Sequence, residues 1–106
     1  NTAGNNTWLG RALEPDAIAR FSSVVVEDVD QARIESGTLM RAAEVDQFNW
    51  DSVVRLCDVV CGNVTSRRSD SDMTLFESLG VALEDIAVAE RVYRLAMSKG
   101  VGLELP

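Results

Sequence analysis

The chain has 106 residues, of which 46% are apolar and 25% are charged, a composition typical of one small folded domain rather than of a disordered chain. Its ten Lys and Arg residues face 17 Asp and Glu, and the net charge of −7 argues against binding to nucleic-acid phosphates. The chain has no histidine, which removes the commonest general base and the commonest metal ligand, so we predict no metal site.

Hydropathy and cysteine spacing both favour a cytoplasmic protein. No apolar run reaches the roughly 18 residues needed to span a membrane, and no basic, apolar leader is present. Cys57 and Cys61 lie four residues apart in an apolar helical pattern, where a disulfide has poor geometry. We therefore expect reduced cysteines packed in the core of a cytoplasmic protein that binds neither membranes nor nucleic acid.

The first quarter of the chain predicts a loop, a helix and a strand. Residues 1–10 are rich in Asn, Gly and Thr, which favours a loop. Pro15 suits the first position of a short helix over about 15–21. The β-branched run at 23–27 predicts a strand that is buried on both faces, as in a parallel sheet.

A second helix is expected directly after this strand. Asp28 and Gln31 have the spacing of a capping box, which predicts a helix over 29–36. Gly37 is a natural residue to end it. Residues 38–47 show no clear period, so we expect a loop there with at most a short turn.

The next segment has a helical pattern. Its apolar positions, with a period close to 3.6 residues, are 50, 53, 54, 57, 60 and 61. Asn49 or Asp51 can cap this helix and Gly62 can end it. Residues 63–72 should form a polar loop. The aromatic residues expected in the core are Trp50, Phe76 and Tyr93.

The longest predicted element is a helix that begins at Thr74. Thr74 and Glu77 repeat the capping-box spacing, and the apolar period continues to Lys99, with Gly100 as the stop. This helix would contain Gly80 one turn inside, where alanine would be more stable by about 1 kcal/mol.

A short strand over 101–105 can end the chain. The order of helices and strands indicates the α/β class. Two strands alone make a poor sheet, so we expect either part of a larger α/β unit or a partial unit whose sheet is completed by a partner chain. An open sheet edge and an uncovered apolar face also predict a homo-oligomer.

Four stretches carry a further pattern. They are NTAGNNTWLGRALEP, VVVEDVDQARIESGTL, CGNVTSRRSDSDMTLFESLG and VALEDIAVAERVYRLAMSKGVG. In this order they resemble the C-terminal part of the ornithine cyclodeaminase/μ-crystallin family of NAD(P)-dependent enzymes. The Thr-Leu-Phe-x-Ser-x-Gly segment with Glu-Asp downstream is the most specific of these motifs, and the likeness covers nearly the whole chain.

The resemblance implies a fold. In that family a Rossmann NAD-binding domain joins a dimerisation and substrate domain that is made from both ends of a longer chain. Residues 1–106 would form a single domain: a partial Rossmann-like unit with few strands, a long C-terminal helix and a tendency to dimerise. The phosphate-binding Gly-x-Gly-x-x-Gly loop does not occur in these residues, because Gly100-Val-Gly102 lacks the third glycine.

The resemblance also implies residues near the cofactor. The family's loop that lines the nicotinamide corresponds to Ala3, Gly4, Asn5 and Asn6. Asn6 stands where ornithine cyclodeaminases have an aspartate that handles a proton, and an amide cannot accept a proton at neutral pH. The alternative for Asn6 is a turn residue beside Asn5.

Two further matches fall near the predicted long helix. Ser78 matches a serine that contacts the nicotinamide end, and Leu79 matches an apolar residue beside the substrate. The N-terminus of the predicted helix would offer unpaired backbone N–H groups beside these two residues. The alternative for Ser78 is an ordinary polar residue of a first helical turn. Glu84 and Asp85 are adjacent on the helix and point apart, which favours a structural role at a loop or a neighbouring subunit.

Two functions of different classes remain open. The chain could be the C-terminal part of an NAD(P)-dependent enzyme for amino-acid deamination or imine reduction, by hydride transfer at the nicotinamide. It would be inactive alone and would bind NAD or NADP weakly, since it lacks the phosphate loop and the substrate-gripping Arg and Lys. A small amino acid or imine would be the substrate of the complete enzyme. Alternatively, it could be a stand-alone dimerising or binding module without catalysis.

Overall fold

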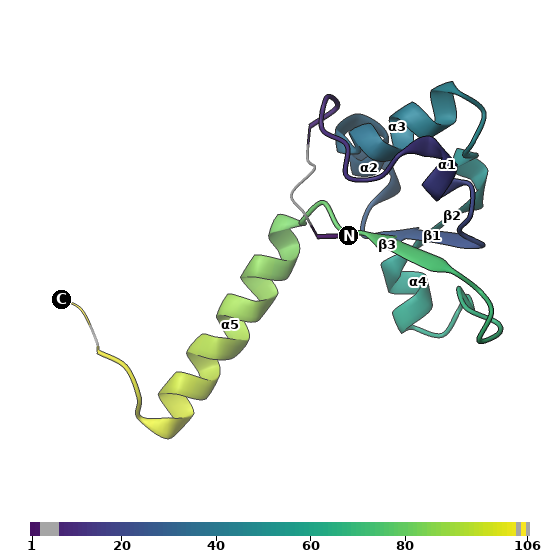
Figure 1. The fold of residues 1–106 in the computed structure, drawn as a ribbon. Helices are drawn as coiled ribbons and strands as arrows, with labels where there is room; N and C mark the ends of the chain where they lie inside the picture. The colour runs from purple at the N-terminus through teal and green to yellow at the C-terminus, as the bar shows by residue number, and fades with distance from the viewer. Residues whose placement is uncertain (3–6, 104, 106) are drawn as a thin grey trace.

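The computed structural model describes residues 1–2, 7–103 and 105, and it shows an α/β body from which one long helix extends (Figure 1). In chain order the elements are α1 (Pro15–Ile18), β1 (Ser23–Val26), α2 (Val29–Glu35), α3 (Gly37–Glu44), a 3₁₀ turn (Trp50–Ser52), β2 (Val53–Arg55), α4 (Leu56–Val60), β3 (Thr74–Glu77) and α5 (Ala82–Lys99).

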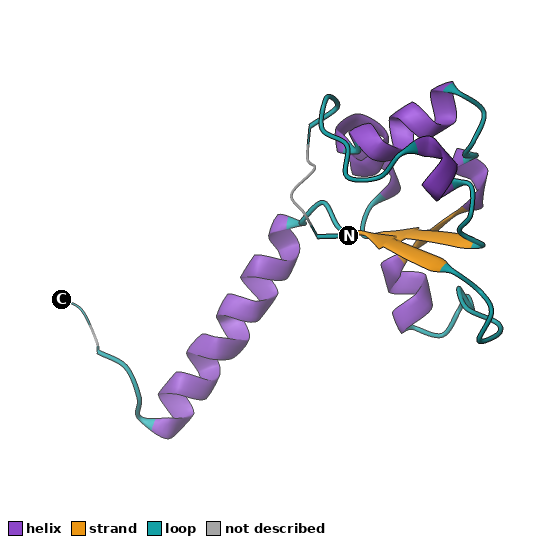
Figure 2. Ribbon diagram, viewed as in Figure 1, coloured by secondary structure: helices purple, strands orange, loops and turns teal. Residues whose placement is uncertain are grey.

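The three strands form one parallel sheet with the order β2-β1-β3. Helices α1, α2 and α3 lie on one face of this sheet and α4 lies on the other (Figure 2). Residues 24–26 of the central strand are all buried, as expected of a parallel strand that is covered on both sides. The predicted α/β class and the predicted strand after residue 22 are therefore confirmed.

The core lies between the sheet and helices α1–α3. Its buried side chains are Ile18, Val24, Val26, Ala32, Leu39, Ala42 and Leu75. Leu39 is fully buried, and the burial of a leucine side chain is worth about 1.5–3 kcal/mol relative to an exposed one. The chain therefore builds a small core from its own residues.

The first two helices begin where the sequence predicts. Pro15 opens α1, although this helix ends at Ile18, earlier than expected. The Asp28 carboxylate caps α2 by accepting a hydrogen bond of 2.8 Å from the Gln31 backbone N–H. The Gln31 side chain does not return to the cap, so the predicted capping box is confirmed on one side only.

Helix α2 ends at Glu35 with Ser36 as its C-cap, so the predicted stop before Gly37 is confirmed, but Gly37 is also the first residue of a further helix. Helix α3 occupies the segment that was expected to be a loop, and the Ser36 hydroxyl caps it by accepting the Leu39 N–H at 3.2 Å. A Cβ at Gly37 would lie 2.6 Å from the Trp8 carbonyl oxygen and closer still to that of Gly10. Glycine is therefore required here so that the loop can cross the start of α3.

The predicted helix over 50–61 is wrong in its first half. The Asn49 side chain caps a 3₁₀ turn, and the chain then forms strand β2 before α4 begins at Leu56. Val53 and Val54 fit a helical period, but they pair with β1, and β-branched residues suit a strand. The predicted stop is confirmed, because Gly62 follows α4 with a φ of 75°.

Several expected core residues lie at the surface. Cys57 and Cys61 are free thiols and both are exposed, so their predicted core packing is wrong. Tyr93 is 66% exposed, which is also contrary to expectation. Phe76 is half-buried, and so is Trp50, whose ring meets that of Phe48 edge-on with centroids 5.2 Å apart.

The segment that was predicted to open the long helix is a strand. Residues Thr74–Glu77 form β3, and α5 begins at Ala82 after a turn. Gly80 lies in this turn with a φ of 78°, a conformation that favours glycine, so it is not a weak point inside a helix. Gly100 ends α5 in the left-handed conformation, as predicted. Residues 101–103 and 105, where a strand was expected, are not in one.

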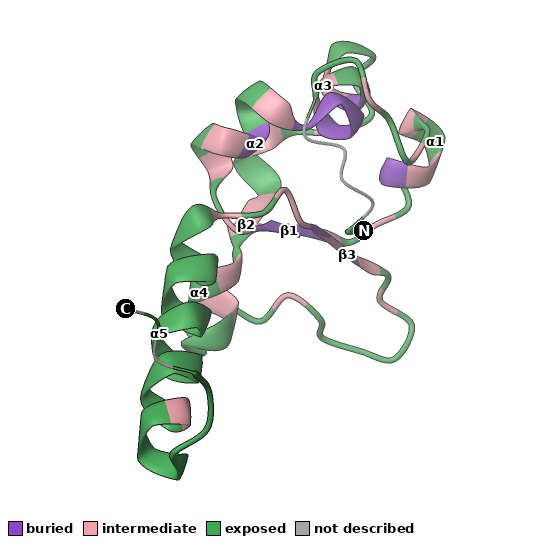
Figure 3. Ribbon diagram, turned by 90° about the vertical axis from the view of Figure 1, so that its left-hand side faces the viewer, coloured by how far each residue is buried: buried purple, intermediate pink, exposed green. Residues whose placement is uncertain are grey.

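Helix α5 is the least covered helix of the described structure. None of its 18 residues is buried, and Figure 3 shows it exposed along its length beyond the body. Its exposed large apolar side chains are Leu83, Ile86, Val88, Val92, Tyr93, Leu95 and Met97. Among the described residues, no helix is both long and apolar enough to cross a membrane.

Candidate functional site at the carboxyl edge of the sheet

The carboxyl ends of the three parallel strands meet at one edge of the sheet. Glu27 follows β1, Leu56 follows β2 and Ser78 follows β3. Open α/β sheets bind ligands outside this edge, so it is the natural place to look for a site. The pairing of Val26 with Glu77 makes the next two residues, Glu27 and Ser78, neighbours across the sheet.

The Glu27 carboxylate joins the ends of β1 and β3. The Ser78 hydroxyl donates a hydrogen bond to Glu27 Oε1. The Leu79 backbone N–H donates to Glu27 Oε2 at 3.2 Å. All three residues are half-buried. One carboxylate therefore fixes both residues that the family resemblance places near a ligand.

Asn1 lies along the outer side of β3. Its amino group donates to the Phe76 carbonyl at 2.6 Å, and its carbonyl accepts the Ser78 N–H at 2.9 Å. These two bonds have the pattern of a parallel ladder in which Asn1 lies opposite Glu77. Asn1 is thereby attached to the carboxyl end of β3, which Ser78 follows.

Glu77 is a fully buried carboxylate beneath this edge. Its Oε2 accepts the Asn1 side-chain amide at 2.7 Å, and its Oε1 accepts the Ser36 hydroxyl at 3.3 Å. A buried carboxylate is costly unless hydrogen-bonded, and these two donors satisfy it. Because Ser36 also caps α3, Glu77 connects the chain start, β3 and α3.

The turn after Ser78 is held from the other side by Gln31. The Gln31 amide nitrogen donates to the Gly80 carbonyl and to Glu35 Oε2, both at 3.0 Å. Glu27 and Gln31 thus fix the turn through side chains of the segment that follows β1. Neither was predicted as a site residue, although Glu27 is the last residue of the strand predicted over 23–27 and could have been indicated by that place.

The end of β2 contributes an ion pair. Arg55 Nε donates to Asp58 Oδ2 at 3.0 Å. This hydrogen bond holds the pKa of Asp58 below its usual range and raises that of Arg55. The Nε–H of this guanidinium is therefore engaged by a carboxylate of its own chain.

The structure describes two of the predicted site residues and not the other four. Ser78 and Leu79 lie at the carboxyl edge, but not at a helix mouth, because α5 starts only at Ala82. Their N–H groups are bonded to Asn1 and Glu27, so the expected unpaired donors are not there. The family's nicotinamide-lining loop, Ala3, Gly4, Asn5 and Asn6, lies outside the described residues.

Glu84 and Asp85 lie in the first turn of α5 and both are exposed. Negative charge is favourable at a helix N-terminus, which gives both residues a structural reason to be there. The role expected for them at a loop or a neighbouring subunit stays a prediction.

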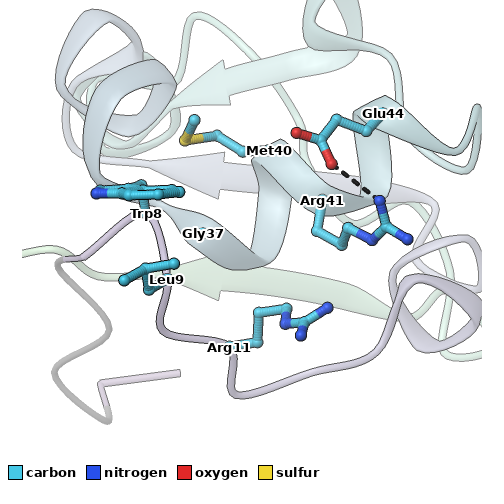
Figure 4. Close-up of a pocket in the computed structure, with 7 residues that line it drawn as sticks. All are labelled: Trp8, Leu9, Arg11, Gly37, Met40, Arg41 and Glu44. Carbon is cyan, nitrogen blue, oxygen red and sulfur yellow. Dashed lines mark hydrogen bonds and ion pairs between the residues drawn. The ribbon is translucent and has the colours of Figure 1, made fainter.

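A separate hollow of about 150 Å³ lies where the loop after residue 6 crosses α3 (Figure 4). It is lined by Trp8, Leu9, Arg11, Gly37, Met40, Arg41 and Glu44. Arg41 is paired with Glu44 at 3.0 Å. Pockets for drug-sized ligands measure about 300–1,000 Å³, so this hollow is too small for a dinucleotide.

Comparison with known proteins identifies related chains. The model of the ornithine cyclodeaminase/mu-crystallin family matches residues 2–100. The Δ(1)-pyrroline-2-carboxylate reductase of Bacillus cereus is 34% identical over 103 residues, which are 96% of this chain and 32% of the reductase. The chain thus spans about a third of that relative's length.

Two solved structures share the fold. The iminosuccinate reductase of Paracoccus denitrificans, in complex with NAD⁺, superposes with a TM-score of 0.80 and 33% identity, covering 97% of this chain and 31% of its own. An archaeal alanine dehydrogenase, a dimer with bound NAD, superposes with a TM-score of 0.73 and 31% identity, covering 91% and 30%.

Proposed function

Because this chain belongs to the ornithine cyclodeaminase/mu-crystallin family, we propose that it forms the C-terminal part of an NAD(P)-dependent enzyme for a small amino acid or its imine. The reaction would be amino-acid deamination or imine reduction. Relatives named as a pyrroline-carboxylate reductase and an iminosuccinate reductase support this class. When bound, the cofactor supplies or accepts a hydride at its nicotinamide ring.

The observation that carries the proposal is the position of Ser78 at the carboxyl edge of the sheet. There Ser78 would meet the nicotinamide end of NAD or NADP, with Leu79 beside the substrate. Ala3, Gly4, Asn5 and Asn6 would line the same end of the cofactor. The attachment of Asn1 to β3 supports this, because it brings the chain to this edge two residues before Ala3.

An amide at Asn6 directs the proposal toward imine or keto-acid chemistry rather than ornithine cyclisation. Asn6 could orient a substrate amine through hydrogen bonds, but it could not accept a proton at neutral pH. The proton would then come from another group of the complete enzyme.

We propose that these residues alone bind the cofactor weakly and have little or no activity. The sequence contains no Gly-x-Gly-x-x-Gly loop, so the backbone cradle for the diphosphate would have to come from elsewhere. Ser78 and its neighbours would hold one end of the dinucleotide, and most of the binding energy from the phosphates would be missing.

Helix α5 favours a second candidate function, a dimerising or binding module without catalysis. Its apolar side chains are exposed along 18 residues, and a helix of this composition is normally covered. The archaeal alanine dehydrogenase of similar fold is a dimer. Both candidates therefore include self-association, which we propose to be a homodimer through α5.

Titration of the chain with NADH and NADPH, followed by nicotinamide fluorescence, tests the first candidate. We expect a dissociation constant in the millimolar range or weaker, with no reduction of Δ(1)-pyrroline-2-carboxylate. Sub-millimolar binding would contradict the expected weak binding, and measurable turnover would show that the chain is a functional enzyme by itself. Light scattering tests the homodimer, and a monomer at high concentration would count against it.

A further inference from the structure

The hydrogen-bond direction at Ser78 limits what this edge can recognise. A serine hydroxyl has one hydrogen to donate and two lone pairs that accept. In the structure that hydrogen is directed to Glu27 Oε1. A ligand that meets Ser78 therefore finds an acceptor and not a donor.

Three further donors beside Ser78 are also committed. The N–H groups of Ser78 and Leu79 go to Asn1 and Glu27. The Gln31 amide nitrogen has two hydrogens, and it donates to Gly80 and Glu35. Among these residues, spare lone pairs remain on Ser78 Oγ and on the Glu27 carboxylate.

We infer that Glu27 is a positioning residue that turns Ser78 into a hydrogen-bond acceptor, so that this edge selects a ligand group bearing N–H donors over a carboxylate. A carboxamide, an ammonium and an iminium share that chemistry. The negative charge of Glu27 acts in the same direction, because it repels a carboxylate at short range. The inference rests on the proposed function, in which the carboxyl edge of the sheet is the cofactor edge, and it specifies which ligand group that edge binds.

An isosteric change at Glu27 reverses the direction of this hydrogen bond. In Glu27→Gln the amide oxygen can still accept the Leu79 N–H. The amide nitrogen then faces Ser78 Oγ and donates to it, which frees the Ser78 hydroxyl to donate to a ligand. The variant keeps the size and the contacts of the side chain while it exchanges an acceptor for a donor.

The experiment uses the complete 106-residue chain labelled with ¹⁵N. It is titrated with NAD⁺ and, separately, with the analogue that carries nicotinic acid in place of nicotinamide. The two ligands differ only in a carboxamide against a carboxylate, and the backbone signals of Ser78, Leu79 and Gly80 report binding. We expect the wild-type chain to prefer NAD⁺ by roughly tenfold, and Glu27→Gln to lose or reverse that preference.

Two small probes separate the possible sources of the N–H group. Nicotinamide represents the cofactor carboxamide, and pyrrolidinium represents a substrate amine without its carboxylate. Stronger shifts at Ser78 with nicotinamide assign the acceptor to the cofactor, and stronger shifts with pyrrolidinium assign it to the substrate. Either result supports the inference.

Two variants serve as controls. Glu35→Gln removes one negative charge from the same edge but leaves the bond between Ser78 and Glu27 in place, so it should keep the preference for NAD⁺. Ser78→Ala removes the Ser78 acceptor and should weaken the preference, with the Glu27 carboxylate accounting for the part that remains. If Glu27 had only a structural role, Glu27→Gln would weaken the binding of both dinucleotides equally. Unchanged backbone signals of residues 24–26 and Leu39 would show that each variant keeps the fold.

The outcomes separate the inference from the proposed function. Equal affinity of the wild-type chain for both dinucleotides, or an unchanged preference in Glu27→Gln, overturns the inference and leaves the cofactor edge standing. If none of the ligands shifts the signals of Ser78, Leu79 and Gly80, the cofactor edge itself is refuted and the inference fails with it.

Discussion

The α/β body and helix α5 are both rich in apolar residues, but they bury them very differently. In the body, β1 and helices α1–α3 enclose a core in which Val26, Leu39 and Ala42 are fully buried. In α5 no residue is buried, and Leu83 is 71% exposed. The body is therefore stabilised by contacts within the chain. Helix α5 instead has an exposed apolar surface of the kind that is usually buried against another molecule.

Matched leucine deletions should show the largest difference between the two regions. Leu39→Ala removes a fully buried side chain and should lower the free energy of unfolding by about 2–5 kcal/mol. Leu83→Ala removes an exposed side chain and should change it by no more than about 0.5 kcal/mol. Urea denaturation of dilute protein measures both, and similar losses for the two variants would contradict the division into body and uncovered helix.

Glycine substitutions test how closely the body is packed. Gly37→Ala places a Cβ against the carbonyl oxygens of Trp8 and Gly10. It should lower the free energy of unfolding by about 1–3 kcal/mol, because the loop must shift to make room. Gly80→Ala meets no atom within 4 Å, so its cost of about 1–2 kcal/mol should come from the φ of 78° alone.

Backbone NMR separates the two glycine effects. The signals of Thr7 to Gly10 should shift in Gly37→Ala, and those of Ser78 to Val81 in Gly80→Ala. If Gly37→Ala is as stable as the wild type, the loop does not lie against the start of α3 as the structure shows.

A charge on α5 should weaken self-association without unfolding the body. Ile86→Lys places a cation among exposed apolar residues and should weaken dimerisation by about tenfold. Glu90→Gln is the matched control, since it also changes the net charge by +1, but at a position that is already polar. Sedimentation equilibrium measures both variants, and an unchanged association constant for Ile86→Lys would remove α5 from the interface.

The smallest effect is expected at the ion pair that follows β2. Arg55 lowers the pKa of Asp58, so Arg55→Gln should raise that pKa toward its ordinary value. Because the folded-state pKa of Asp58 is depressed, its stabilising effect is present above the unfolded pKa and is lost as the pH falls through the folded pKa. NMR titration of Asp58 measures the shift, and no change in Arg55→Gln would assign the low pKa to another cause.

The elements that could be predicted are those with a local cause. The β-branched run of β1, the Asp28 cap and the stops at Gly62 and Gly100 each depend on residues close in sequence. Strands β2 and β3 were mistaken for helix because each is only three or four residues long and continues the helical period of its neighbours. Their pairing with β1 is a contact between distant segments, which periodicity does not contain.

The candidate site divides in the same way. Ser78 and Leu79 were found through family motifs, and the structure brings them to the carboxyl edge. Glu27 was missed because its importance comes from a hydrogen bond to a residue 51 positions away. The end of α2 before Gly37 was predicted, but the reason for a glycine there was missed, since the carbonyl groups that require it belong to the loop at residues 7–10.

The central claim is that the body carries the cofactor edge while α5 serves as an interaction surface. Mapping NAD⁺ on the ¹⁵N-labelled chain tests it most directly. The account predicts that the largest shifts fall at Glu27 and at Ser78, Leu79 and Gly80, with the second half of α5 unchanged. Shifts concentrated in α5, or around the hollow between Trp8 and Arg41, would contradict it.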